Sequence, residues 1–153
     1  MSVEPIEAIR SLLYRYAECV DAADFAALGR LFAAGEIRAA GLPAPLRGAE
    51  AVARFYAGAN RVHEDGTLRT KHVVSNEIVE LDAGGATARA RSLFVVYQAT
   101  ERLPLQAIAA GRYHDRFERT ADGWRFAARE ILLDLAGDLS EHLRIRLPGR
   151  GAP

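Results

Sequence analysis

Two side chains far apart in the sequence could together carry out proton transfer: the imidazole of His72 and the carboxylate of Asp21. Imidazole titrates near neutrality, and a neutral imidazole held by a carboxylate is a competent general base. His72 lies in the stretch TKHVVSNEIVEL, whose alternation predicts a β-strand with His72, Val74, Asn76 and Ile78 on one face. If that face lines a pocket, His72 lies in the pocket. Asp21 directly follows an apolar helix, whose end we expect at the pocket's mouth.

Each candidate also has an ordinary structural role, which the sequence leaves open. Asp21 can begin the turn between two helices, because aspartate is a preferred turn and cap residue. His72 can bond a loop carbonyl at the end of a strand, and Asn76 is more typical of a bulge or loop than of a ligand contact. Tyr14 and Tyr16 lie on a predicted amphipathic helix, where tyrosines are typically core residues with their hydroxyls at an edge.

The N-terminal part of the chain carries the helical period that must position Asp21. Apolar residues recur at steps of three and four from Pro5 to Val20, and Pro5 suits a first helical turn. Asp24 can cap a second helix, FAALGRLFAAG, which Gly35 would end. A third helix is expected over AEAVARFYAGA, after the Pro/Gly-rich piece AAGLPAPLRG.

The second half of the chain changes to a period of two. Four long runs separated by turn signals predict an antiparallel meander: TKHVVSNEIVELDAGG, ATARARSLFVVYQ, LPLQAIAAGRYHDRFERTADG and WRFAAREILLDLAG. Helices followed by strands indicate the α+β class, here a cone-shaped curved antiparallel sheet wrapped by three N-terminal helices. We expect one domain over residues 1–145 and a disordered Gly/Pro/Arg tail over residues 146–153.

The first strand is apolar on both faces, because Val73, Val79 and Leu81 alternate against Val74 and Ile78. Helices can cover only one face of a sheet, so the other needs a different partner. We therefore expect a homo-oligomer, either a dimer or a trimer.

Composition argues against several classes of function. The chain has 153 residues, of which 50% are hydrophobic, so one domain can bury a core without metal or disulfide support. Its formal net charge is zero with both signs spread along the chain, which disfavours nucleic-acid or membrane-surface binding. Cys19 is the single cysteine, and the chain has neither a secretory signal pattern nor an apolar run of ~20 residues. We expect a cytoplasmic protein.

Metal and nucleotide cofactors are not predicted. His63, His72, His114 and His142 show no HxxxH or HxH pairing, so a closed zinc site has no support. No GxGxxG follows a strand and no phosphate-cradling loop occurs. His114 alternates with arginines in AAGRYHDRF, a pattern that predicts an exposed position.

Three segments together, YRYAECVDAADFAALGRLF, TKHVVSNEIVEL and GRYHDRFERTADGWRFAARE, resemble the SnoaL-like branch of the nuclear transport factor 2-like superfamily. That superfamily includes ketosteroid isomerase, scytalone dehydratase, bile acid dehydratase and hexachlorocyclohexane dehydrochlorinase. The resemblance spans roughly residues 5–143 and implies an α+β barrel of the cystatin-like roll type. It is specific for the fold and less specific for the activity, because the superfamily hosts many chemistries.

The resemblance also implies roles for single residues. Asp21 and His72 stand where the dehydratases and the dehydrochlorinase carry their Asp-His base pair, and Tyr16 matches a tyrosine of bile acid dehydratase. The dehydrochlorinase has a lysine at that position, so its absence argues against halide elimination. Arg129 has the spacing of an arginine that stabilises the leaving anion, although it could equally be a surface strand residue. Scytalone dehydratase adds a tyrosine that EIRAAGLPAPLRG lacks, and the Asp-Arg-Asp set of limonene epoxide hydrolase cannot be placed.

The function these observations favour is that of a cofactor-independent lyase, of dehydratase type, or isomerase. His72 would remove a proton from a carbon of a hydrophobic cyclic substrate, with Asp21 orienting it and Tyr16 and Arg129 assisting. The expected substrate-binding residues are Tyr14, Leu31, Phe55, Val74, Asn76, Phe94 and Phe126. The alternative is a non-catalytic ligand-binding or assembly subunit, as in the small subunits of ring-hydroxylating dioxygenases of the same superfamily.

Overall fold

A computed structural model describes residues 3–148 of the chain. Helix α1 (Val3–Asp21) is followed by α2 (Phe25–Leu31), and the short strands β1 (Glu36–Ala39) and β2 (Leu46–Arg47) precede α3 (Gly48–Ala59). Four long strands then complete the fold: β3 (Thr70–Leu81), β4 (Thr87–Gln98), β5 (Gln106–Thr120) and β6 (Gly123–Ala136). The three helices and the four long strands confirm the predicted α+β class. No helix among the described residues is long and apolar enough to cross a membrane.

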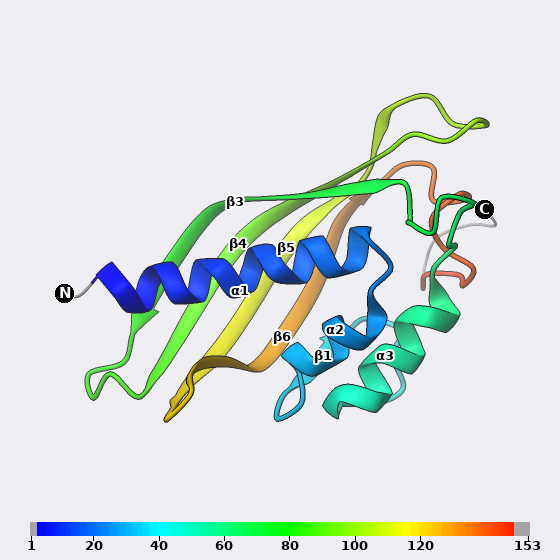
Figure 1. Ribbon diagram of the computed structural model, residues 1–153. Coiled ribbons are helices and arrows are strands. Elements are labelled where there is room, and N and C mark those ends of the chain that lie inside the picture. The colour runs from blue at the N-terminus through cyan, green and yellow to red at the C-terminus, as the bar shows by residue number, and fades with distance from the viewer. Residues whose placement is uncertain (1–2, 149–153) are drawn as a thin grey trace.

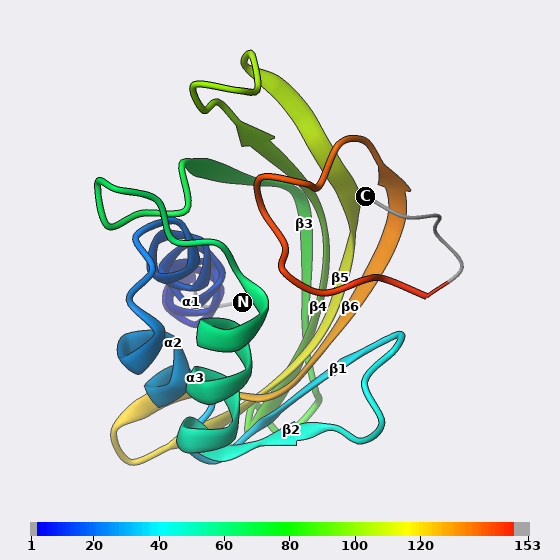
Figure 2. The ribbon, with the colours of Figure 1, turned by 90° about the vertical axis from the view of Figure 1, so that its right-hand side faces the viewer.

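The strands form one curved sheet in the order β2-β1-β6-β5-β4-β3. Figure 1 shows the long strands β3, β4, β5 and β6 side by side in it. All three helices lie against its concave side, and the C-terminal segment runs across the open end between the sheet and the helices (Figure 2). The expected sheet was purely antiparallel. Instead β1 pairs in parallel with β6, and β2 and β3 are the edges of a sheet that does not close into a barrel.

The strands β1 and β2 were not predicted, because they are short. Strands of four and two residues are too short for alternation to be visible. The partner of β1 is also remote in the chain, since Glu36 pairs with Ala128. The predicted N-cap of α2 is confirmed, because Oδ1 of Asp24 accepts a hydrogen bond from the amide of Ala27 at 3.0 Å.

A bulge in β3 changes which residues face the helices. The register shifts between Ser75 and Ile78, and Asn76 adopts a positive φ of 56°, a conformation that asparagine tolerates. His72 and Val74 therefore remain on the inner face, whereas Asn76 and Ile78 are exposed. The prediction that all four share one face was wrong, because simple alternation does not allow for an inserted residue.

The core lies between α1, the other helices and the concave face of the sheet. α1 contributes Ile9, Leu13, Tyr16 and Val20, all at most 2% exposed and spaced by three to four residues as an amphipathic helix requires. α1 thus runs across the sheet with its C-terminal end beside β3, where Asp21 is its last residue. The helical period of the sequence therefore sets both the buried face of α1 and the position of Asp21.

Candidate functional site

A cavity of about 600 Å³ opens between the helices, the concave face of the sheet and the C-terminal segment. Most of its wall is apolar or aromatic, with a small number of polar side chains, which is the usual character of a small-molecule site. Side chains on this wall include Tyr16, Val20, Phe55, Tyr56, His72, Phe94, Val96, Tyr113, Ile131, Leu133 and His142.

The Asp21–His72 pair lies at one side of this cavity, and His72 is the member on its wall. Oδ1 of Asp21 is 2.6 Å from Nδ1 of His72, and the side chains are 14% and 8% exposed respectively. The carboxylate also accepts hydrogen bonds from the backbone amide of His72, at 2.9 Å to Oδ2, and from Oγ1 of Thr70, at 2.7 Å to Oδ1. Because the Asp21 carboxylate accepts a hydrogen bond from Nδ1–H, Nε2 of the neutral imidazole of His72 is left with a free lone pair.

The local chain geometry explains why the two residues meet. The amide of Leu68 donates a hydrogen bond of 3.1 Å to the backbone carbonyl of Asp21, which fastens the end of α1 to the start of β3. Burial acts to raise the pKa of Asp21, but hydrogen bonds and charge from His72, with a further bond from Thr70, outweigh it and lower the pKa. Asp21 is therefore held as a carboxylate.

A pair of tyrosine hydroxyls lies on the helical side of the cavity. The hydroxyl oxygens of Tyr16, on α1, and Tyr56, on α3, are 2.5 Å apart, and both residues are buried. Burial raises the pKa of both phenols, so each hydroxyl keeps its proton at neutral pH. One hydroxyl can donate to the other, which leaves the second proton available to a ligand oxygen.

Arg129 lies behind these tyrosines rather than on the cavity wall. Its guanidinium makes two hydrogen bonds to Asp115, of 2.8 and 2.9 Å, and both side chains are fully buried. The guanidinium carbon lies 4.2 Å from the ring centre of Tyr16 and 3.7 Å from that of Tyr113. Burial opposes the charge, but the neighbouring Asp115 carboxylate outweighs burial and raises the pKa of Arg129. Arg129 therefore carries a permanent positive charge behind Tyr16. Because it is not on the cavity wall, it does not contact a leaving group directly.

The remaining predicted binding residues fall into two groups. Phe55 and Phe94 line the cavity. The others do not. Tyr14 is 44% exposed and donates to Glu77 at 2.8 Å. Asn76 is exposed at the bulge.

The three apolar residues outside the cavity have packing roles. Phe126 is fully buried in the core, where it stacks on Phe32 with ring centres 4.7 Å apart. Leu31 is half-buried against the hydrophobic core, and Val74 packs against the same core while lining a separate groove beside Asp21. Apolar type alone could not distinguish core packing from cavity lining.

Four polar or aromatic residues around the site were not among the predicted site residues. Tyr113 and Asp115 could have been found, because the alternation that placed His114 outside also places these two on the inner face of β5. Tyr56 lies on the buried face of α3, where the helical period alone does not distinguish a core residue from one on the cavity wall. His142 lies beyond the last strand in a segment without regular structure, so no periodic signal pointed to it.

The tail predicted from residue 146 onward begins with three residues that the structure places. Arg146, Leu147 and Pro148 lie against the cavity, and residues 149–153 are outside the described part of the chain. Within residues 3–148, no group of three or more His, Cys, Asp and Glu side chains is arranged to hold a metal ion.

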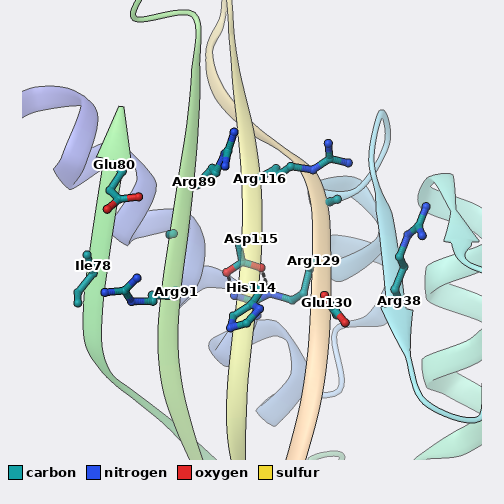
Figure 3. Close-up of a pocket in the computed structure, with 12 residues that line it drawn as sticks. Arg38, Ile78, Glu80, Arg89, Arg91, His114, Asp115, Arg116, Arg129 and Glu130 are labelled. Carbon is teal, nitrogen blue, oxygen red and sulfur yellow. Dashed lines mark hydrogen bonds and ion pairs between the residues drawn. The ribbon is translucent and has the colours of Figure 1, made fainter. Parts of the chain in front are cut away.

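One region of the outer face of the sheet is strongly charged. His114 is exposed there, as predicted, and it lies in a shallow depression with Arg89 and Arg91 of β4 and Arg116 of β5 (Figure 3). Glu80 and Glu130 border the same area. The helices lie behind the strands in this view, so the charged depression and the apolar cavity are on opposite faces of one sheet.

Comparison with known proteins shows which families and solved structures this chain is similar to. A family model described as a SnoaL-like domain matches residues 1–130, and the match ends before the C-terminal segment that carries His142. A solved structure of a nuclear transport factor 2-like protein with a cystatin-like fold, from Novosphingobium aromaticivorans, is 29% identical. It has a TM-score of 0.72, and the alignment covers 86% of this chain and 82% of that one.

Two further solved structures share the fold at lower identity. A provisionally assigned scytalone dehydratase from Novosphingobium aromaticivorans is 21% identical with a TM-score of 0.72, over 98% of this chain and 97% of that chain. ActVI-ORFA from Streptomyces coelicolor is 17% identical with a TM-score of 0.68, over 84% and 96% of the two chains. At these identities the likeness concerns the fold.

Proposed function

The chain belongs to the SnoaL-like domain family, and we propose that it is a cofactor-independent lyase or isomerase of the dehydratase type, acting on a small hydrophobic cyclic molecule. The observation that carries this proposal is the hydrogen-bonded Asp21–His72 pair at the wall of a largely apolar cavity. The same fold occurs in a provisionally assigned scytalone dehydratase.

His72 is the proposed general base. Its Nε2 lone pair takes a proton from a carbon next to a carbonyl group, and Asp21 stabilises the imidazolium that forms because its carboxylate is already bonded to Nδ1. General base catalysis of this kind contributes roughly 10²- to 10⁴-fold to a rate. The electron pair of the broken C–H bond moves onto the carbonyl oxygen and gives an enolate.

The Tyr16–Tyr56 pair is proposed to bind that enolate oxygen. A donor aimed at developing negative charge is most effective where water is excluded, and both hydroxyls are buried. The guanidinium of Arg129 lies over the Tyr16 ring and makes negative charge near that phenol less costly, without touching the ligand. In this role Arg129 is a positioning and electrostatic residue.

The enolate can then resolve in two ways. If the next carbon carries a hydroxyl group, the electron pair returns to form a C=C bond, the C–O bond breaks, and the imidazolium of His72 returns its proton to the departing hydroxide to give water. If the substrate instead carries a C=C bond conjugated with the enolate, the imidazolium returns the proton to the far end of that dienolate, and the reaction is an isomerisation that shifts the C=C bond. Phe55 and Phe94 on the wall suit a flat ring system.

A substrate panel can test this assignment. The purified chain is incubated in D₂O with hydroxylated cyclic ketones and steroid ketones, and loss of water and deuterium incorporation are followed by mass spectrometry. Wild type is compared with His72→Ala and Asp21→Asn, and with His114→Ala as a control on the outer face. We expect the two site variants to lose turnover and the control to retain it. Equal turnover in all four proteins would eliminate His72 as the base.

The same panel distinguishes the alternative role. A non-catalytic ligand-binding or assembly subunit would bind ring compounds saturably and leave their carbon-bound hydrogens unexchanged. The hydrogen-bonded base on the cavity wall favours catalysis over this alternative, because a passive pocket has no need of a carboxylate-held imidazole.

A further inference from the structure

A second imidazole faces the cavity beside His72. His142 lines the same cavity and is 8% exposed, and its ring centre is 6.2 Å from that of His72 with the two planes inclined at 62°. His142 takes no part in the hydrogen bond between Asp21 and His72, and the proposed proton transfer does not use it. Its Nδ1 atom is buried and has no hydrogen-bond partner within residues 3–148.

The segment that carries His142 is firmly attached to the body of the protein. The carbonyl oxygen of His142 accepts a 2.8 Å hydrogen bond from the amide of Arg61, and the amide of Arg144 donates to the carbonyl of Ala59 at 2.8 Å. Leu143 forms an isolated bridge with Asn60, and Nε2 of Gln98 donates to the carbonyl of Glu141 at 3.0 Å. These bonds fix the backbone on both sides of His142, so the ring is held over the cavity by the end of α3 and the end of β4.

The two imidazoles differ in their hydrogen-bonding partners. His72 has its Nδ1 proton committed to Asp21 and offers a lone pair. His142 lacks a carboxylate partner; the charged and titratable groups that act on it are His72, Asp21 and His63. Burial first, and then the neighbouring His72, lower the pKa of His142 to about 3, so it is neutral at physiological pH and carries one N–H. A base and a neutral donor therefore lie side by side on one wall.

We propose that His142 donates a hydrogen bond to an oxygen atom of the ligand that binds beside His72, which makes the C-terminal segment a part of the binding site. A plain hydrophobic lid residue would cover the cavity equally well without burying a polar nitrogen, so packing alone does not explain a histidine here. This inference rests on the proposed function only in that the cavity takes an oxygen-bearing ring compound; it does not require that His72 act as a base.

The test compares two bicyclic probes that differ by one oxygen atom, 1-tetralone and tetralin. Their affinities are measured for wild type, His142→Leu and His142→Gln, with His114→Leu as a control on the outer face. Wild type should prefer the ketone, and His142→Leu should reduce that preference roughly 3- to 10-fold. The glutamine variant keeps an N–H donor and should restore part of the preference, and the control should match wild type. An unchanged ketone preference in a folded His142→Leu protein would overturn the proposal.

A second measurement uses the wild-type protein and follows the histidine ring nitrogens by NMR. With ¹⁵N-labelled histidine in the full chain, the ring nitrogens of His142, assigned from the spectrum of His142→Gln, should move on addition of 1-tetralone and much less with tetralin. Identical movement with both probes, or no saturable binding of either, would contradict the proposal. In His72→Ala the ketone preference should persist while deuterium exchange is lost. The role of His72 as the base is therefore tested by deuterium exchange, and the role of His142 as the donor is tested separately by the ketone preference.

Discussion

Oδ1 of Asp21 lies 2.6 Å from Nδ1 of His72, although 51 positions separate the two residues in the chain. The carboxylate is held in place by three further hydrogen bonds, two from the backbone amide of His72 and one from Thr70. It therefore fixes both the orientation and the tautomer of the imidazole on the cavity wall.

Asp21→Asn should slow proton abstraction roughly 10²- to 10⁴-fold, the range that base catalysis supplies. Asparagine keeps the size of the side chain but cannot stabilise the imidazolium as it forms. Thr70→Val is the matched control, because it removes one hydrogen bond and leaves the carboxylate, and should cost less than about 10-fold. Deuterium exchange rates on a cyclic ketone measure both. Equal losses in the two variants would mean that the carboxylate has only a structural role.

The stability conferred by Asp21 should depend on pH. The pKa of Asp21 is lowered in the folded protein, so its carboxylate stabilises the fold above the unfolded value of about 3.9, and this stability is lost as pH falls through the folded pKa. The difference in the free energy of unfolding between wild type and Asp21→Asn should therefore shrink between about pH 5 and pH 2. Urea titrations at several pH values measure it. A pH-independent difference would contradict the lowered pKa, since the other carboxylates are common to both proteins and cancel.

Removal of either hydroxyl of the Tyr16–Tyr56 pair should lower turnover by about 10²-fold, the usual effect of losing one donor to a developing oxyanion. Tyr16→Phe and Tyr56→Phe keep the rings and lose only the oxygen. Tyr97→Phe, on a residue that is 40% exposed, is the control. The loss should be in kcat rather than KM if the hydrogen bond forms only as charge develops. A change confined to KM would reassign the pair to ground-state binding.

The buried Arg129–Asp115 ion pair should be costly to break on one side. Arg129→Met leaves Asp115 without its partner in a fully buried position and should destabilise the protein by about 3–5 kcal/mol. The double variant Arg129→Met with Asp115→Leu removes both charges and should recover much of that loss. Unfolding in urea, with Asp115→Leu alone as the third variant, gives the free energies needed. Strictly additive effects would show that the two charges do not stabilise each other.

The outer face of the sheet should mediate self-association. Val73, Leu93 and Tyr97 are 46%, 40% and 40% exposed on neighbouring strands β3 and β4, where the three helices do not cover them. Val73→Glu combined with Leu93→Glu should shift the protein from a dimer or trimer to a monomer in analytical ultracentrifugation. Arg15→Gln, on an exposed position of α1, is the control. A wild type that is monomeric at all concentrations would refute the expected homo-oligomer.

Local patterns in the sequence were sufficient to predict the three helices, the four long strands and part of the candidate site. The three-to-four period over Pro5–Val20 predicted a helix that ends beside Asp21, and the period of two predicted the four long strands. These predictions were correct because each depends on neighbours within one or two turns or on successive residues of one strand. The SnoaL-like resemblance then named Asp21, His72 and Tyr16, three residues that lie at or beside one cavity.

Only the tertiary structure decided the features that depend on distant or irregular contacts. The parallel pairing of β1 with β6 and the position of Arg129 behind Tyr16 both arise from partners remote in sequence. The bulge at Asn76 inserts one residue and reverses the face on which the later residues of β3 lie, which a pattern of strict alternation cannot represent. His142 reaches the cavity through the main-chain hydrogen bonds of a segment without periodicity, and for such segments only the folded backbone determines where a side chain lies.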